Sequence, residues 1–393
     1  MKKGKEVLRE LYNFEGFSFS EICKEILVLI HMKKKGKTGI CPVCNKKRRK
    51  VIETRTRKVR DVNFGNEKCF IVFEAYRIKC KCGYRSMEKL DFVLPNEMIT
   101  ERFAEHIFHL CEKMSLSDAA ETAMVDWRTA KRIDKKKLQE RFKNLDNINP
   151  TRIGVDEIAH EKGHKYLTIV RDIDAGVIWV GEKRKKETLD KFFAELGKEK
   201  SSKIIVAVID MWDPFIKSIK ENTNAEIVFD KFHISKKINE AVDNIRKREF
   251  AKADKEERIN MKHKRFLILY RNKNLNREQE KDLNELMEQN KNLYEAYLLK
   301  EQALNIFERR QRNVALRKLE NWKKNVHESK IEEFAKLLKT LEHYWYGIEN
   351  YFTHHVTNGA SEGYNNKINI IKRRAYGFKD LEYFKLKILQ SCS

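Results

Sequence analysis

The spacing of apolar residues divides the chain into helical and strand-like segments. Between Pro95 and Pro150, apolar residues recur every three or four positions, which predicts three short helices. After Pro150 the spacing becomes strand-like and predicts an antiparallel meander. Its three strands are expected at 153–158, 166–170 and 177–180. The following run, 204–209, is apolar throughout, as expected for a strand buried on both faces of a sheet.

The remaining apolar pattern predicts that helices interrupt this sheet. A helix is expected at 187–196 and a further strand at 225–229. From Phe215 to Tyr346 the chain contains no Gly or Pro and is rich in Leu, Glu and Lys, so most of 231–346 is expected to be helical. The pattern therefore predicts an α/β fold, in which a large helical insertion interrupts a mixed sheet.

The composition indicates a polyanionic partner. The 393 residues include 83 Lys or Arg and 59 Asp or Glu, a formal net charge of +24. Such a charge attracts nucleic acid or an anionic membrane surface. The longest apolar runs, residues 26–30 and 204–209, are far below the ~20 residues that span a bilayer. The sequence therefore predicts a soluble, cytoplasmic protein that binds nucleic acid rather than a membrane.

Four of the eight cysteines form two closely spaced pairs: Cys41 with Cys44, and Cys80 with Cys82. Thiolates two to four positions apart on tight turns bind one tetrahedral zinc ion, and two such turns joined by a hairpin form a zinc ribbon. The strand-like segments 50–59 and 70–78 supply the hairpin. The second pair has one intervening residue where ribbons usually have two, so Cys69 or a histidine could replace one ligand. The alternative is a set of free reduced cysteines.

Residues 116–143 have the outline of a helix-turn-helix. Residues 96–126 carry 2 basic and 7 acidic side chains, whereas 127–143 carry 8 basic and 2 acidic ones. A basic second helix suits phosphate contacts around a major groove. The candidate DNA contacts in it are Arg128, Lys131 and Arg132. The alternative is a solvated helical hairpin that links two domains.

Three carboxylates occur where a ribonuclease-H-like sheet needs them. Asp156 lies in the first predicted strand, Asp210 ends the buried strand, and Glu362 begins a late helix. Two-metal phosphoryl transfer gathers acidic oxygens around two Mg²⁺ ions about 4 Å apart. Asp156 and Asp210 can be neighbours if the first and fourth strands are adjacent. Asp230 and His233 either cap the long helix that follows or line this site.

Several motifs together resemble the ISL-three family of insertion-sequence transposases. They are the paired cysteines, the helix-turn-helix, and the segments 154–157, 209–212, 230–233 and 358–367. The resemblance covers nearly the whole chain. It implies a DDE transposase whose catalytic triad is Asp156, Asp210 and Glu362, with two Mg²⁺ (or Mn²⁺) ions as cofactor and a structural Zn²⁺. It also implies that Asp230 and His233 form an Asp-x-x-His motif that organises the active site.

The residues and the resemblance lead to one hypothesis for the mechanism. The ribbon and helix-turn-helix bind the terminal inverted repeats, the triad with Mg²⁺ cuts a strand at each end, and the freed 3′-hydroxyl attacks target DNA. Asn365 and Asn366 position the DNA or the triad helix. Three basic residues follow and either hold phosphates or form a solvated helix face: Lys367, Lys372 and Arg373. Since two ends are joined, we expect a homodimer, and the insertion either contacts DNA ends or dimerises.

Six segments are expected along the chain. They are an N-terminal helical segment (1–36), a zinc-ribbon-like domain (37–95), a helix-turn-helix domain (96–149), the first part of the ribonuclease-H-like catalytic core (150–240), an all-helical insertion (241–345) and the C-terminal part of the core (346–393). Two other functions compete with the transposase. One is a catalytically inactive DNA-binding regulator derived from such an enzyme, and the other is a structure-specific nuclease on the same fold.

Overall fold

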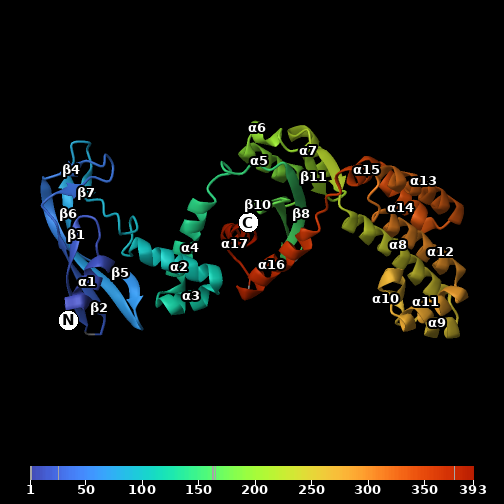
Figure 1. Cartoon of the computed structure of the whole chain (residues 1–393), viewed down its shortest axis with the longest axis horizontal. Coiled ribbons are helices and arrows are strands. Elements are labelled where there is room, and N and C mark those ends of the chain that lie inside the picture. Colours follow the sequence, from blue (N-terminus) through green and yellow to red (C-terminus); the bar gives the residue numbers. More distant parts are fainter. Residues whose placement is uncertain (1, 25, 162, 164, 376) are drawn as a thin grey trace. The chain divides into compact units, whose positions relative to one another are not determined.

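The computed structural model describes residues 2–24, 26–161, 163, 165–375 and 377–393. The chain forms two compact units, Met1–Lys143 with Lys372–Leu386, and Asn144–Ile371 with Lys387–Ser393 (Figure 1). The C-terminal segment that the sequence assigned to the catalytic core is therefore divided between the units. Every described helix is too short or too polar to cross a bilayer.

The first unit opens with a mixed sheet in the strand order β1-β2-β6-β5, with β7 beside β6. Its strands are β1 (Phe17–Lys24), β2 (Val28–Lys34), β5 (Val51–Phe64), β6 (Glu67–Lys79) and β7 (Arg85–Met87). The long strands β5 and β6 pair antiparallel and form the hairpin that the sequence predicted. A two-stranded ribbon of β3 (Gly39–Ile40) and β4 (Lys47–Arg48) lies between β2 and β5 in the chain.

The segment 1–36, predicted to be helical, is helical only at its start. Helix α1 (Lys2–Leu11) is followed by β1 and β2, so the prediction is wrong beyond Leu11. In β2, Val28, Ile30 and Met32 are buried and alternate with more exposed residues. Alternate burial is typical of a strand with one covered face, whereas a helix buries residues three or four apart.

Three helices follow the first sheet, as predicted: α2 (Glu101–Lys113), α3 (Leu116–Ala123) and α4 (Trp127–Arg141). Each begins at a side-chain cap, because Thr100, Ser115 and Asp126 each accept a hydrogen bond from a backbone N–H of the following turn. The buried Asp61 of β5 joins the helices to the sheet. Its carboxylate accepts hydrogen bonds from Thr100 Oγ1 at 2.6 Å and Arg102 Nε at 2.8 Å.

The second unit contains a mixed sheet in the order β10-β9-β8-β11-β12. Its strands are β8 (Arg152–Glu161), β9 (Lys165–Asp172), β10 (Gly176–Glu182), β11 (Val206–Ile209) and β12 (Glu226–Phe229). The first three strands form the predicted antiparallel meander, and β11 pairs in parallel with both β8 and β12. The first and fourth strands are therefore neighbours, as a ribonuclease-H-like sheet requires. Between them in the chain lie α5 (Lys186–Leu196) and α6 (Lys198–Ser201), and α7 (Asp213–Asn222) follows β11.

A block of helices follows β12. Its helices are α8 (Lys231–Lys252), α9 (Lys255–Met261), α10 (Arg265–Leu269), η1 (Asn272–Asn274), α11 (Arg277–Gln289), α12 (Lys291–Ile306), α13 (Arg312–Ser329), α14 (Glu332–His343) and α15 (Trp345–His354). One apolar cluster extends from the sheet into this block, so the helical insertion shares the core of this sheet. The chain ends with α16 (Ala360–Arg374) and α17 (Leu381–Cys392).

Candidate active site, zinc site and DNA-binding helix

Two carboxylates and one imidazole meet beside the parallel strands β8 and β11. Val208 of β11 pairs with Gly154 of β8, so Asp156 and Asp210, each two positions further along, lie side by side. His233 comes from the first turn of α8, directly after β12. Ligand atoms of Asp156, Asp210 and His233 lie within 4.8 Å of one another. His233 Nε2 lies 2.8 Å from Asp210 Oδ1.

The electrostatics of this group favour binding of a cation. Burial raises the pKa of Asp156, and the nearby Asp210 carboxylate raises it further. Hydrogen bonds from the Glu157 N–H and from Asn365 lower the pKa, but the net shift is upward. Burial also raises the pKa of Asp230. For His233 burial lowers the pKa, but the carboxylates of Asp210, Asp230 and Asp156 outweigh it and the net shift is upward. Crowded, half-buried carboxylates repel one another, and a bound cation relieves that repulsion.

Asp230, for which the sequence left two roles open, caps helix α8. Its side chain accepts a hydrogen bond from the Phe232 N–H at 3.2 Å, and only 3% of the residue is exposed. Its charge also acts on His233, since it contributes to the raised pKa of that imidazole. The cap therefore fixes the start of α8 and the position of His233 together.

The donor set fits a hard divalent cation. Asp210 Oδ1 is buried and accepts no directional hydrogen bond from a described residue, although His233 Nε2 lies within ion-pair distance. One imidazole does not offset the charge of two crowded carboxylates, and a bound cation would reduce the cost of burying them. Mg²⁺ and Mn²⁺ prefer carboxylate oxygens, which Asp156 and Asp210 supply.

Helix α16 lies beside β8 (Figure 1). Asn365 Nδ2 donates a hydrogen bond to Asp156 Oδ2 at 3.1 Å. Glu362 lies in the first turn of this helix and is exposed, outside the group formed by Asp156, Asp210 and His233. Residues three apart project from the same face of a helix, so Glu362 and Asn365 share the face that meets Asp156. Asn366 is exposed and points along another direction of the helix.

A buried hydrogen-bonded pair anchors the chain just before α16. Arg171 Nε donates to Asn358 Oδ1 at 2.6 Å, and the Arg171 guanidinium also donates to the Thr357 carbonyl at 3.3 Å. Both side chains are almost fully buried, with 3% exposure for Arg171 and 2% for Asn358. The pair crosses strand β8 at Gly154, where a Cβ atom would lie 2.5 Å from Asn358 Oδ1. Glycine at this position therefore allows the contact that holds α16 near Asp156.

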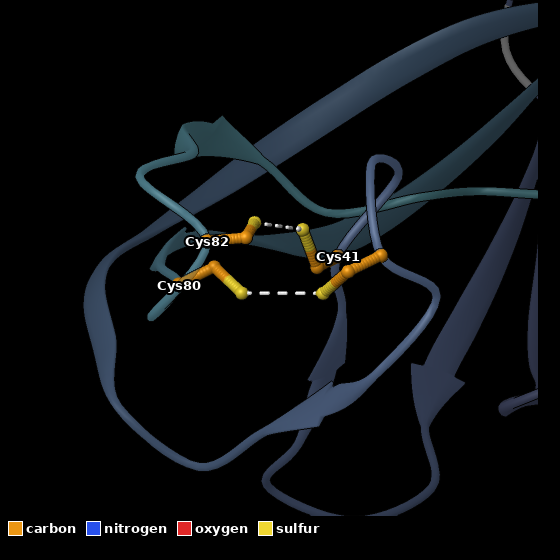
Figure 2. Close-up of side chains that lie close together, drawn as sticks. Cys41, Cys80 and Cys82 are labelled. Atoms are coloured by element: carbon orange, nitrogen blue, oxygen red, sulfur yellow. Dashed lines mark hydrogen bonds between the residues drawn. The ribbon is translucent and has the colours of Figure 1, made fainter.

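The four paired cysteines converge at the base of the β5–β6 hairpin: Cys41, Cys44, Cys80 and Cys82. Figure 2 shows the sulfur atoms of Cys41 and Cys82 facing each other, 3.7 Å apart. The sulfur atoms of Cys44 and Cys80 are 3.4 Å apart. The Cys82 backbone N–H and the Arg48 guanidinium lower the pKa of Cys80 to about 6, against its burial. Four thiolates in one cluster match a structural zinc site.

Cys69 does not belong to this cluster. It is fully buried in the core of the first sheet, where its sulfur lies 3.9 Å from the Tyr12 hydroxyl. Burial raises the pKa of Cys69. The Cys80-x-Cys82 spacing is therefore compatible with a four-cysteine ligand set. A separate group of Glu21, Cys23 and His31 lies near the exposed end of the β1–β2 pair.

Helix α4 carries the basic residues expected to contact DNA, and the structure pairs several of them with acids. Lys131 Nζ lies 2.9 Å from Asp380, and Arg132 forms an ion pair with Glu97. Arg128 is exposed at the start of the helix, where its guanidinium stacks on the Trp127 ring. Of the three candidates, Arg128 is the one that the fold leaves most available to DNA.

The segment that supplies Asp380 packs on α4 as part of the first unit. Lys135 Nζ lies 3.1 Å from Asp380 and 2.8 Å from Glu382. The Tyr383 hydroxyl donates to Asp134 at 2.5 Å, and Tyr383 shares an apolar cluster with Leu138. The other three candidate DNA contacts lie on or near α16: Lys367 and Arg373 are exposed, and Lys372 is half-buried.

Comparison with known proteins decides the family. A model of ISL3 transposases matches residues 153–388, more than half of the chain. The chain belongs to the ISL3 family of transposases. In this transposase, a zinc-finger model of the transposases of IS204, IS1001, IS1096 and IS1165 matches residues 37–82, and the helix-turn-helix model of family ISL3 matches 88–136.

Two relatives of the transposase match over most of their length. It is 31% identical to the transposase for insertion sequence element IS1001 of Bordetella parapertussis, over 91% of this chain and 90% of the relative. It is 26% identical to the transposase for insertion sequence element IS1557 of Mycobacterium tuberculosis (strain CDC 1551 / Oshkosh), over 82% of this chain and 78% of that protein. The mixed α/β fold, the zinc ribbon and the helix-turn-helix predicted from the sequence are thereby confirmed.

Sequence reasoning missed two positioning residues of this transposase, Arg171 and Asn358. Arg171 follows the mostly apolar residues 167–170 of β9, and a charge near the end of a strand buried on both faces is a signal that it has a buried partner. Asn358 stood within a recognised motif, but its partner lies 187 positions away. No local pattern joins the two.

Proposed function

We propose that this transposase cuts DNA at the terminal inverted repeats of its insertion sequence and joins the freed ends to target DNA. Asp156, Asp210 and Glu362 form the catalytic triad in this proposal and bind Mg²⁺, for which Mn²⁺ substitutes. The observation that carries it is the meeting of Asp156 and Asp210 beside the adjacent parallel strands β8 and β11, with His233 against Asp210.

The side chains around the two aspartates have separate tasks. Bound Mg²⁺ supplies Lewis-acid chemistry, which makes the attacking oxygen more nucleophilic and stabilises the leaving oxygen. Asn365 holds Asp156 by its amide, and His233 lies against Asp210. Glu362 sits one helical turn before Asn365 and closes the ligand set from α16. The pair of Arg171 and Asn358 keeps that helix in place.

The reaction proceeds in two displacements at phosphorus. In the first, a water oxygen attacks the phosphodiester at the element end, the bond to the 3′ oxygen breaks, and a free 3′-hydroxyl and a 5′-phosphate result. In the second, that 3′ oxygen attacks a target phosphodiester and displaces a 3′ oxygen of the target strand. One bond forms and one breaks in each step, so no external energy source or covalent protein intermediate is needed.

DNA recognition belongs to the first unit. The helix-turn-helix presents the N-terminal end of α4 to the major groove, with Arg128 and the exposed Trp127 at that end. The zinc ribbon, folded around Zn²⁺ by its four cysteines, binds DNA beside it. Because both ends of the element are cut and joined, the active form is a homodimer.

The test is strand cleavage of a duplex that carries the terminal inverted repeat, in Mg²⁺ or Mn²⁺. We expect Asp156→Asn, Asp210→Asn and Glu362→Gln each to reduce the cleavage rate by at least ~10³-fold, with DNA affinity unchanged. Asp213→Asn is the matched control, because this exposed carboxylate lies three residues from Asp210 and accepts a hydrogen bond from the Tyr344 hydroxyl. Cleavage that survives Asp210→Asn would refute the mechanism, and binding without cleavage by the parent protein would identify an inactive regulator.

A further inference from the structure

The zinc ribbon carries the densest run of positive charge in the chain. Residues 46–50 are five consecutive Lys or Arg residues, separated from Cys44 by Asn45 alone. Four of them are exposed: Lys46, Lys47, Arg49 and Lys50. We call these four side chains the basic knuckle. No ion pair joins any of them to an acidic residue in the described part of the chain, which leaves four cations facing solvent.

The fifth residue of the run, Arg48, turns inward. Its Nε donates to Cys80 Sγ at 3.0 Å, and its guanidinium also approaches Cys44 Sγ at 3.8 Å. Arg48 therefore offsets the negative charge of the thiolates behind the knuckle. The backbone here is held in place, because Lys47 pairs with Ile40 and Arg48 with Gly39 in the β3–β4 ribbon. A fixed, unneutralised group of cations is what a phosphate backbone recognises.

The basic residues of helix α4 provide the contrast. Lys131 and Lys135 contact Asp380, and Lys137 contacts Glu101 and Glu105. These cations are already neutralised within the first unit. Part of the positive charge of α4 is therefore unavailable to DNA, whereas all four side chains of the basic knuckle are available to it.

The length of strand β5 relates the knuckle to the helix-turn-helix. Val51 begins this strand beside the knuckle, and Asp61, ten residues later, holds Thr100 and Arg102 at the start of the helices. At ~3.3 Å per residue, the two points lie about 30 Å apart. One turn of B-DNA is about 34–36 Å long. Arg60 of the same strand also donates to the Ala123 carbonyl at the end of α3, just before α4. A straight duplex that runs along β5 with its major groove on α4 would therefore return its backbone to the knuckle after about one turn.

We propose that the basic knuckle binds the phosphate backbone of the DNA about one helical turn from the major-groove site of the helix-turn-helix. The contact is independent of base sequence and sets affinity and register. The proposal rests on the proposed DNA binding by the ribbon and helix-turn-helix and does not depend on the catalytic triad. Both experiments measure binding without strand cleavage, so a failure of the triad proposal would not affect them.

The first experiment measures the salt dependence of DNA binding. The full-length variant Lys46→Gln/Lys47→Gln/Arg49→Gln/Lys50→Gln and the parent are titrated with an inverted-repeat duplex, without added Mg²⁺ so that no strand is cut. Each phosphate contact contributes about 0.9 to the slope of log affinity against log salt. We expect the slope to become shallower by about 2 to 4, and affinity at ~0.1 M salt to fall by at least tenfold.

A matched control removes the same charge elsewhere: Lys191→Gln/Lys198→Gln/Lys203→Gln/Lys217→Gln, all exposed on α5, the α6 region and α7. We expect this variant to keep the parent slope. An equal effect of the two variants would show that only net charge matters and would overturn the proposal, as would an unchanged slope in the knuckle variant.

The second experiment is a hydroxyl-radical footprint on the same duplex. We expect the parent to protect backbone positions about ten base pairs from the major-groove site, and the knuckle variant to lose that protection alone. Zinc content and circular dichroism verify folding. If the fourfold variant loses zinc, Lys46→Gln/Lys50→Gln, which lies outside β4, replaces it, with an expected slope change of about 1 to 2. Protection that persists in a folded variant contradicts the proposal.

Discussion

Gly154→Ala tests whether the buried Arg171–Asn358 pair holds helix α16 in place. The new Cβ atom would lie 2.5 Å from Asn358 Oδ1 and 2.8 Å from Arg171 Nε. These atoms are the acceptor and donor of one buried hydrogen bond, 2.6 Å long. Neither can move away from the methyl group without lengthening that bond. The substitution therefore opposes one specific interaction.

The expected loss of stability follows from two terms. Overpacking a buried site costs about 1–3 kcal/mol, and weakening a hydrogen bond to a charged group costs about 1.5–3 kcal/mol. The terms are not additive, because relief of the clash is what breaks the bond. We therefore expect Gly154→Ala to lower the unfolding free energy of the second unit by about 2–4 kcal/mol.

The assay is denaturant unfolding followed by tryptophan fluorescence. Four of the five tryptophans lie in the second unit: Trp179, Trp212, Trp322 and Trp345. In an Asn358→Ala background the nearest atom is gone, so Gly154→Ala should cost less than about 1 kcal/mol there. The control is Gly363→Ala in α16, where the Cβ meets no atom within 4 Å, and helix propensity predicts a gain of up to ~1 kcal/mol. An equal cost of Gly154→Ala in both backgrounds would refute the reasoning.

Three further predictions concern the first unit. Metal analysis should find about one zinc per chain. The zinc should be lost in Cys82→Ser and kept in Cys23→Ser, because Cys23 is exposed and lies outside the four-cysteine cluster. Arg128→Ala should weaken binding of the inverted-repeat duplex by about tenfold or more, whereas Lys131→Ala should change it less than about threefold, since Lys131 is paired with Asp380; similar losses in a titration would contradict this. Burial raises the pKa of Asp380, but the ammonium groups of Lys131 and Lys135 outweigh burial and lower the pKa to about 2, below the ordinary ~3.9. Its charge thus stabilises the fold above pH ~4, and that contribution disappears as pH falls toward 2. Asp380→Asn should cost on the order of 2 kcal/mol by urea unfolding at pH 7 and about half of that at pH 3; a cost that does not depend on pH would exclude the charge as its cause.

Periodicity predicted most of the elements of this transposase. The meander, the buried strand, the ribbon hairpin and the three helices before Pro150 all occur where apolar spacing indicated. The exception was the segment after Leu11, where the apolar run 26–30 leads into β2 without alternating, and periodicity alone does not distinguish such a run from a buried helix. Local patterns report which face of an element is covered, and they do so best over long segments.

The sequence by itself determined where the chemistry of the chain resides: two aspartates at a strand and a strand end, four cysteines on turns, and a basic run after Cys44. Only the tertiary structure decided which residues meet. Asn365 rather than Asn366 contacts Asp156 because neighbouring helical residues point about 100° apart and the packing of α16 selects one direction. Likewise, Arg171 contacts Asn358 across β8 because the packing of the unit brings together two residues that are 187 positions apart in the chain. Secondary structure follows from short-range periodicity, whereas such contacts depend on strand order and helix rotation, which the packing of the whole unit sets.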